Sequence, residues 1–187
     1  MQASLFAWND MILTVDPASH GLSGELKPPG DKSISHRAVI FASLAAGRSE
    51  LIGLLESEDT LATMRACEQL GAIIKRADEK LYIYGTGGEL KRPHDGFLEM
   101  GNSGTAMRLL AGVLSGQNFD CTLSGDESLN GRPMSRIVTP LKMMGANITA
   151  SVGGTAPLLI QKGSGLHGIE YDSPVASAQI KSCVLLA

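Results

Sequence analysis

The stretch from Phe97 to Ser115, FLEMGNSGTAMRLLAGVLS, predicts a short strand over 97–100 followed by a helix over 103–115. Apolar residues recur at helical spacing in its second half, namely Ala106, Leu109, Leu110, Val113 and Leu114. Beyond it we expect strands over residues 118–123, 147–150 and 158–161, and a helix over residues 133–144. The order is β-α-β-α-β-β, which predicts an α/β fold.

The preceding segment repeats this order. We expect strands over residues 22–27, 50–55, 73–75 and 81–84, and helices over residues 33–46 and 59–70, the second capped by Asp59. The ends of the two second helices match, since Gln69-Leu70-Gly71-Ala72 corresponds to Met143-Met144-Gly145-Ala146, 74 residues later. Units of this length cannot bury their own apolar faces, so they are expected to pack on one another.

A third unit begins near the end of the chain. Residues 168–172 are expected to form its first strand and residues 177–187 its first helix. The last residues, Val184-Leu185-Leu186-Ala187, contain no glycine or polar cap. The sequence therefore predicts two complete βαβαββ units plus the start of a third, and we expect the third unit to be truncated.

Composition excludes several classes of protein. The chain has 187 residues, with 16 Lys and Arg against 19 Asp and Glu, so its net charge is −3. That balance argues against a broadly basic nucleic-acid binder, and only 4% aromatic residues argue against a base-stacking surface. No apolar run approaches the about 18–20 residues of a membrane span, and residues 1–10 lack the features of a secretory signal.

Cysteine usage favours a reducing compartment. Cys67, Cys121 and Cys183 are far apart, and none is followed by a second cysteine or a histidine at zinc-ligand spacing. We therefore expect neither a disulfide framework nor a metal site, and we predict a cytoplasmic protein.

Four segments, each with basic residues or hydroxyl groups, precede or open predicted helices. They are Pro28–Arg37 (PPGDKSISHR), Gly101–Arg108 (GNSGTAMR), Asp126–Met134 (DESLNGRPM) and Ser173–Gln179 (SPVASAQ). Free N–H groups and the helix dipole favour anions at such places. The first segment is not a phosphate-binding P-loop, because Asp31 stands where that motif needs a glycine before the lysine.

The basic residues of these segments are candidates for one anion-binding pocket. They are Lys32, Arg37, Arg108 and Arg132. Arg37 and Arg108, 71 residues apart, are expected to occupy equivalent places in their units. Gly104 would let a ligand approach the backbone, and Ser177 and Gln179 could donate hydrogen bonds to it. The alternative for the first segment is a capped helix whose charges are only solvated. For the second it is a turn shape that serves packing of the repeats, and for the third a surface arginine.

These motifs, in this order, resemble the N-terminal half of the 5-enolpyruvylshikimate-3-phosphate synthase family, the 3-phosphoshikimate 1-carboxyvinyltransferases. The resemblance runs from about Ile12 to Ala187. It implies an inside-out α/β barrel type of fold, with six βαβαββ units in two domains. Residues 1–30 would be an N-terminal extension with first strands that pack with a C-terminal domain. Residues 31–187 would be the N-terminal substrate-binding domain, and the C-terminal half would be missing.

The resemblance also implies roles for single residues toward phosphoenolpyruvate and shikimate 3-phosphate, without a cofactor or metal. Lys32 would contact both substrates and be catalytic, while Ser33 and Arg37 would hold the shikimate carboxylate. Gly104 and Arg132 would line the phosphoenolpyruvate side, Ser177 and Ala178 would meet the 3-phosphate, and Gln179 would meet both substrates. Asn102, Thr105 and Arg108 are possible further contacts. The family's acid/base carboxylates would lie in the missing half, so Asp126 and Glu127 are not favoured as catalytic groups.

Glyphosate binds beside phosphoenolpyruvate in this family, and two features of the chain make opposite predictions about it. Gly104 leaves room for the inhibitor, which favours sensitivity. Ala178, where many relatives have a second serine, resembles the class II branch, which favours resistance.

Two alternatives remain. A UDP-N-acetylglucosamine enolpyruvyl transferase has a similar fold, but it carries a cysteine shortly before its Arg-Pro pair, where this chain has Glu127. The second is a non-catalytic anion-binding domain. For the 187-residue chain alone, we expect weak binding of shikimate 3-phosphate and negligible turnover.

Overall fold

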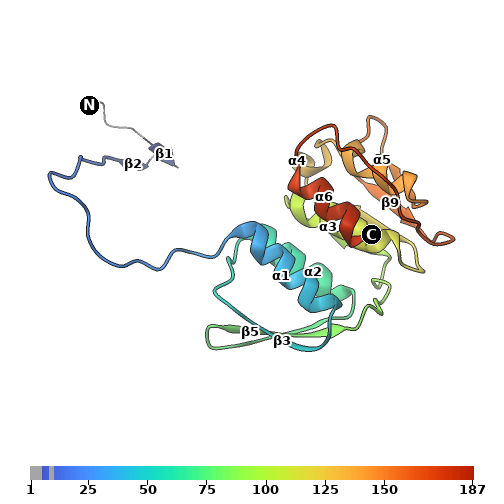
Figure 1. The fold of residues 1–187 in the computed structure, drawn as a ribbon, viewed down its shortest axis with the longest axis horizontal. Coiled ribbons are helices and arrows are strands. Elements are labelled where there is room, and N and C mark those ends of the chain that lie inside the picture. The colour runs from blue at the N-terminus through green and yellow to red at the C-terminus, as the bar shows by residue number, and fades with distance from the viewer. Residues whose placement is uncertain (1–5, 9–10) are drawn as a thin grey trace.

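A computed structural model describes residues 6–8 and 11–187, and it is an α/β structure with three separate sheets. A two-stranded sheet joins β1 (Phe6–Trp8) and β2 (Met11–Leu13) antiparallel. An extended, mostly exposed segment, residues 14–31, leads from it to the main body (Figure 1). Of the expected N-terminal extension, residues 1–5 and 9–10 lie outside the described residues.

The unit predicted from the opening stretch forms a four-stranded sheet in the order β6-β7-β9-β8. Its elements are β6 (Phe97–Glu99), α3 (Gly104–Ser115), β7 (Cys121–Ser124), α4 (Glu127–Asn130), α5 (Ser135–Met143), β8 (Asn147–Ala150) and β9 (Leu158–Gln161). β6 and β7 are parallel, and the other neighbours are antiparallel. The predicted order of elements is confirmed, and the short helix α4 is an addition that the sequence did not predict.

The preceding unit forms a three-stranded antiparallel sheet in the order β3-β5-β4. Its elements are α1 (Lys32–Leu44), β3 (Ala46–Ile52), α2 (Glu58–Gln69), β4 (Ile73–Ala77) and β5 (Lys80–Thr86). α2 begins one residue before Asp59, because Ser57 caps it in a reciprocal arrangement with Thr60. The prediction of Asp59 as the cap was therefore wrong.

Two predicted strands are absent, and those predictions were wrong. Residues 22–27 and 168–172 are described by the structure and form no strand, although each stands where β6 stands in its own unit. Leu22 and Leu26 are exposed instead of packed.

Both segments also differ from the β6 region at one backbone donor. Met100, three residues before the residue that caps α3, donates its N–H to the Ser124 carbonyl at 2.8 Å and so joins the end of β6 to β7. The residues three before the caps of α1 and of α6 (Ala178–Leu186) are Pro28 and Pro174. Because proline has no N–H, neither can make this bond.

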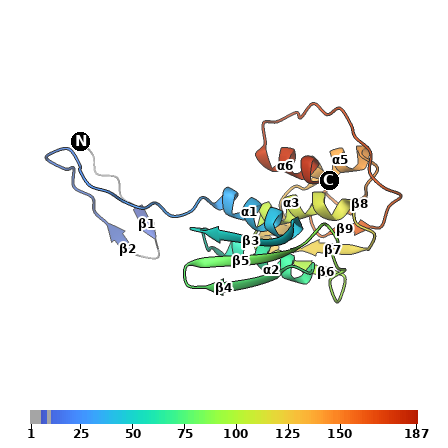
Figure 2. The same cartoon turned by 60° about the horizontal axis from the view of Figure 1, so that its bottom comes forward.

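The core lies among the helices and the inner faces of the two larger sheets. α3 is its most buried helix, and it contacts α1, α2, α5 and α6. Figure 2 shows α1 and α3 on one side of the β3–β5–β4 sheet, with α6 beyond them. α3 and α6 are very close, since a Cβ added at Gly112 would lie 2.1 Å from the Cys183 carbonyl oxygen. Gly112 is therefore required by packing.

The cysteines are part of this core. Cys67, Cys121 and Cys183 are buried and unpaired, and burial raises the pKa of Cys67 to about 11 and those of Cys121 and Cys183 to about 12. Their thiols are thus protonated at neutral pH, and they serve here as small apolar side chains. Among residues 6–8 and 11–187, no helix has both the length and the apolar character needed to cross a membrane.

Candidate anion-binding site

Two guanidinium groups converge on the start of α3. Ser103 caps this helix by accepting a hydrogen bond from the Ala106 N–H at 3.2 Å. A Cβ added at Gly104, the first residue of the helix, would lie 2.8 Å from Nη1 of Arg108 and 3.2 Å from Nη1 of Arg132. Glycine at this position therefore lets both guanidinium groups lie against the first turn of α3. The arrangement combines two full charges with the positive end of a helix dipole.

Arg132 comes to this place from the loop before α5. It donates through Nη2 to the side-chain oxygen of Asn102. Asn102 in turn donates through Nδ2 to Oδ2 of Asp126 at 2.8 Å. The second and third predicted segments are thus joined by side chains.

Arg108 is half-buried and holds three parts of the chain together. It donates to the carbonyl oxygens of Gly104 at 3.3 Å and Pro133 at 3.2 Å, and to Oε1 of Gln179 at 3.0 Å. Burial lowers its pKa, and the nearby positive charges of Arg132 and Arg136 lower it further. These contacts place Arg108 at the wall of the site.

The fourth predicted segment reaches the second through Gln179. Its Nε2 donates to Oγ1 of Thr105 at 2.9 Å, while its Oε1 accepts from Arg108. Ser177 caps α6 by accepting from the Ile180 N–H at 3.4 Å. The exposed Ala178 begins the helix.

The first predicted segment reaches the others by way of α6. Arg37 donates through Nη2 to Oγ of Ser182 at 2.7 Å and through Nη1 to the Ser33 carbonyl at 3.1 Å. Lys32 pairs with Asp59 at 3.0 Å, and half of its side chain is exposed. The sequence did not single out Ser182, and Asp59 was considered only as a cap.

The expected equivalence of Arg37 and Arg108 is wrong by one residue. Arg108 is the fifth residue of α3, whereas Arg37 is the sixth of α1. One residue turns a side chain by about 100° around a helix. Arg37 therefore contacts Ser182, whereas Arg108 contacts Gln179.

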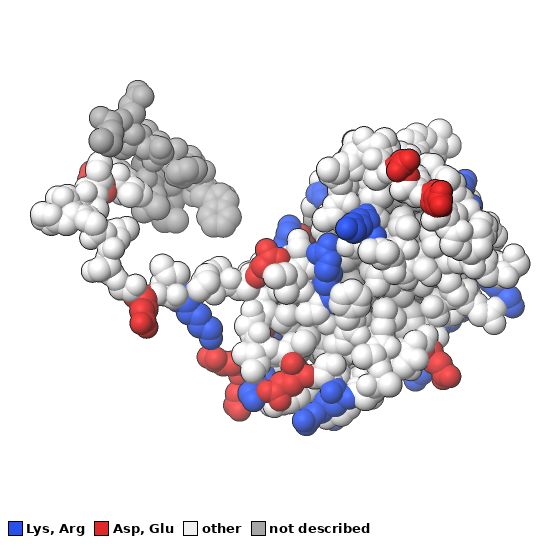
Figure 3. Space-filling view, viewed as in Figure 1, with Lys and Arg blue, Asp and Glu red and all other residues white. Residues whose placement is uncertain are grey.

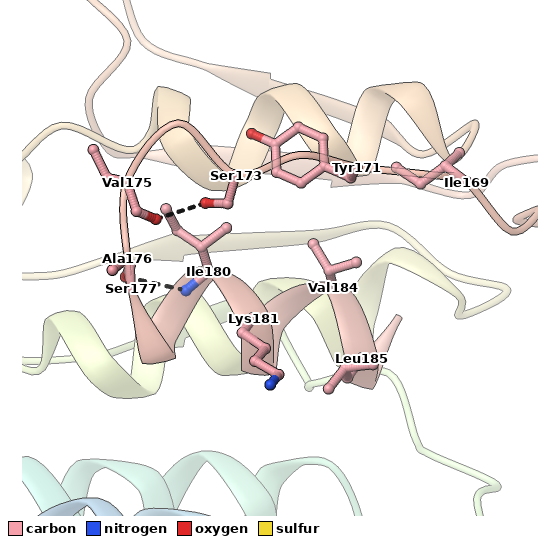
Figure 4. Close-up of a pocket in the computed structure, with 10 residues that line it drawn as sticks. All are labelled: Ile169, Tyr171, Ser173, Val175, Ala176, Ser177, Ile180, Lys181, Val184 and Leu185. Atoms are coloured by element: carbon pink, nitrogen blue, oxygen red, sulfur yellow. Dashed lines mark hydrogen bonds between the residues drawn. The ribbon is translucent and has the colours of Figure 1, made fainter.

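A separate groove of about 520 Å³ lies along the other side of α6 (Figure 4). It is mostly apolar and includes Ile169, Tyr171, Ile180 and Val184. Of the predicted site residues it includes only Ser177. The groove is therefore distinct from the place where the arginines meet.

Charges elsewhere on the surface are mixed. Figure 3 shows basic side chains close together over the region of α1 and α6, and acidic ones scattered around them. In the part of the chain that the structure describes, no group of three or more His, Cys, Asp or Glu side chains is arranged to hold a metal ion.

His36 belongs to the first segment, and its burial makes stability depend on pH. It is fully buried, its Nδ1 is 2.7 Å from Oγ1 of Thr63, and its Nε2 has no partner among the described residues. Burial lowers its pKa below 6.5, with Asp59 acting in the opposite direction. The folded state therefore favours neutral His36, so the free energy of unfolding should fall as the pH falls below 6.5.

The measurement is urea unfolding from pH 7.5 to 5. His36→Asn should flatten the profile in this range, while the same change at the exposed His20 should leave it as in the wild type. A wild-type profile identical to that of His36→Asn would contradict the burial of a neutral imidazole.

Comparison with known proteins identifies the family to which the chain belongs. The family model described as EPSP synthase (3-phosphoshikimate 1-carboxyvinyltransferase) matches residues 17–187. A 3-phosphoshikimate 1-carboxyvinyltransferase of Methylococcus capsulatus is 51% identical over 179 residues, which are 95% of this chain and 41% of that protein. One of Alkalilimnicola ehrlichii is 52% identical over 167 residues, 89% of this chain and 37% of that protein.

Solved structures agree. An EPSP synthase from Acinetobacter baumannii superposes with a TM-score of 0.83 at 48% identity, over 87% of this chain and 37% of that one. The chain thus spans about two-fifths of the length of the relatives that it matches. The UDP-N-acetylglucosamine enolpyruvyl transferases considered above are not the family whose model matches. The chain belongs to the EPSP synthase family.

Proposed function

We propose that this chain supplies one side of an enolpyruvyl transferase site, which binds phosphoenolpyruvate and shikimate 3-phosphate. The observation that carries the proposal is the convergence of Arg108 and Arg132 on Gly104, at the start of α3. A phosphate or carboxylate there would meet two guanidinium groups and a helix N-terminus, and both kinds of group favour an anion.

The reaction places the same demand on the site. The 5-hydroxyl of shikimate 3-phosphate gives up its proton and adds to C2 of phosphoenolpyruvate as C3 takes up a proton to become a methyl group. The tetrahedral intermediate then expels phosphate from C2 while a base removes a proton from C3, which restores the double bond. Two phosphates and two carboxylates must come together, so fixed cations are needed. Arg132 and Gly104 would serve the phosphoenolpyruvate side. Lys32 would serve both substrates once a ligand phosphate competes with Asp59 for its ammonium group.

The shikimate 3-phosphate side would be built from α1 and α6. Arg37 has five N–H donors, and its contacts with Ser182 and Ser33 leave others free for a ring carboxylate. Ser177, Ala178 and Gln179 would meet the 3-phosphate and the second substrate from the start of α6.

The finer description of the fold belongs to the same proposal. The units would form an inside-out α/β barrel, with helices inside and sheets outside. Residues 1–30 would be an extension that packs with a C-terminal half, and residues 31–187 a substrate-binding domain. The first helices of the three units are α1, α3 and α6. α3 packs against both α1 and α6, and the β3–β5–β4 sheet lies on the outer side of α1, which supports this arrangement (Figure 2).

Titration of the 187-residue chain tests the proposal. Shikimate 3-phosphate, followed by NMR and calorimetry, should bind weakly and shift the signals of Lys32, Arg37 and Ser177. Phosphate release from phosphoenolpyruvate should be negligible, since the acid/base carboxylates are proposed to lie in a C-terminal half. Turnover at an ordinary enzymatic rate would contradict that division, and unchanged signals at these residues would contradict the binding site.

Replacement of Arg132 by alanine tests how the pocket is divided. The change should weaken binding of phosphoenolpyruvate by about tenfold or more, which is a loss of about 1.4 kcal/mol, and affect shikimate 3-phosphate much less. Calorimetry with each ligand separately measures both effects. Arg136→Ala is the matched control, because Arg136 is a nearby exposed arginine without a side-chain hydrogen bond among the described residues. Equal losses for the two ligands would show that the division is wrong.

A further inference from the structure

A chain of side chains behind Arg132 determines how its guanidinium lies. Arg132 donates to the Asn102 oxygen, and Asn102 donates to Oδ2 of Asp126 at 2.8 Å. Asp126 is itself fixed, because its Oδ1 accepts the Leu129 N–H at 2.7 Å and so caps α4. A carboxylate held at the cap of a short helix is thus linked through one amide to a proposed ligand-binding cation.

The orientation of the Asn102 amide follows from its two neighbours. A primary amide has an acceptor oxygen on one side and two N–H donors on the other. Arg132 can only donate, and an ionised Asp126 can only accept, so a single orientation satisfies both. The hydrogen bond from Asn102 also lowers the pKa of Asp126, which keeps this carboxylate ionised.

We propose that Asp126 is a positioning residue, which acts through Asn102 to hold the Arg132 guanidinium over the start of α3. The role in binding rests on the proposed function, in which Arg132 meets phosphoenolpyruvate. The proposal is unexpected from charge alone, since a carboxylate near an anion site repels the ligand. Asp126 would favour binding because the affinity gained by ordering Arg132 exceeds the affinity lost to repulsion between the Asp126 carboxylate and the anion.

Asp126→Asn separates the positioning role from the cap. Asparagine is as good a helix cap as aspartate, so its oxygen can still accept from the Leu129 N–H. The rest of the new side chain is an NH₂ group, which faces the Asn102 NH₂ group. Two donors then oppose each other, and Asn102 can relieve this only by turning its own NH₂ toward Arg132.

Glu127→Gln is the matched control. It removes the same charge from the adjacent residue, whose side chain makes no hydrogen bond within the described part of the chain. Simple electrostatics predicts that either substitution tightens binding of an anion. The positioning role predicts tightening or no change for Glu127→Gln, but loss for Asp126→Asn.

The first measurement needs no ligand. NMR relaxation of the Nε–Hε group reports the order of the Arg132 side chain in the free protein. We expect it to be ordered in the wild type and in Glu127→Gln, and mobile in Asp126→Asn and in Asn102→Ala. Adding Asp126→Asn to Asn102→Ala should produce no further change, because the path is already broken. Equal order of Arg132 in the wild type and in Asp126→Asn would overturn the proposal.

The second measurement is calorimetric titration with phosphoenolpyruvate. Asp126→Asn should weaken binding by about threefold or more, which is roughly 0.7 kcal/mol, while urea unfolding remains close to that of the wild type. Unweakened binding despite a mobile Arg132 would overturn the proposed benefit of positioning. If Arg132 becomes mobile but the wild type itself does not bind phosphoenolpyruvate, the positioning role stands and the proposed function fails.

Discussion

Gly112→Ala should lower the free energy of unfolding by about 2 kcal/mol. Alanine is a better helix former than glycine by about 1 kcal/mol, so the isolated helix would gain. In the folded protein, however, the new Cβ would lie 2.1 Å from the Cys183 carbonyl oxygen and 3.2 Å from the Cys183 Cα. Backbone atoms cannot rotate away, so α3 and α6 must separate, and overpacking of this kind costs typically 1–3 kcal/mol or more.

Urea unfolding followed by circular dichroism measures the loss. Gly116→Ala is the matched control at the end of the same helix, where a Cβ would touch only Leu166 and Ala187 at 3.8 Å. The backbone there, with φ −90°, is open to alanine. If Gly112→Ala instead stabilised the protein, as an ordinary glycine replacement in a helix does, the close contact between α3 and α6 would be wrong.

Gly104→Ala should have the opposite profile, with a large loss of binding and little change in stability. Its Cβ would meet the ends of two flexible side chains, Nη1 of Arg108 at 2.8 Å and Nη1 of Arg132 at 3.2 Å. Both guanidinium groups are the far ends of flexible side chains, so they can shift to make room without movement of the backbone. They would then leave the places from which they face a ligand, and affinity for phosphoenolpyruvate should fall by about tenfold or more.

Calorimetry and urea unfolding on the same samples separate the two effects. Gly131→Ala is the control, because it adjoins Arg132 and its Cβ would make only ordinary contacts, at 3.6 Å with the Glu127 carbonyl and 3.7 Å with that of Ser128. It should leave both quantities unchanged. Unaltered affinity in Gly104→Ala would mean that the ligand does not use the space between the arginines.

Sequence patterns predicted the parts of the fold that local chemistry determines. Helices begin where Ser103 and Ser177 can cap them, and the apolar spacing of α3 marks a buried helix. The strand patterns before α1 and α6 were misleading, because a strand also needs a neighbour to pair with, and residues 22–27 and 168–172 have none among the described residues. Pro28 and Pro174 also lack the N–H that Met100 donates to Ser124 in the second unit. Hydrophobic alternation carries no information about that single bond.

For the candidate site, the sequence predicts a set of residues but not the hydrogen bonds that join them. Lys32, Arg37, Arg108 and Arg132 stand out by charge and motif. Their partners, among them Asp59 and Ser182, are ordinary polar residues that only the packing of distant segments brings to them. A difference of one residue in helix register, as between Arg37 and Arg108, is also below what sequence spacing can resolve.

The double attachment of α6 has a thermodynamic consequence. Gln179 ties this helix to α3 and Ser182 ties it to α1, so one short element bridges two units. Docking of the helix and occupancy of the site are then reciprocally linked. A ligand that engages Arg108 and Gln179 would protect the backbone amides of α6 from hydrogen exchange. Fraying of α6 would in turn weaken binding of that ligand by the same free energy.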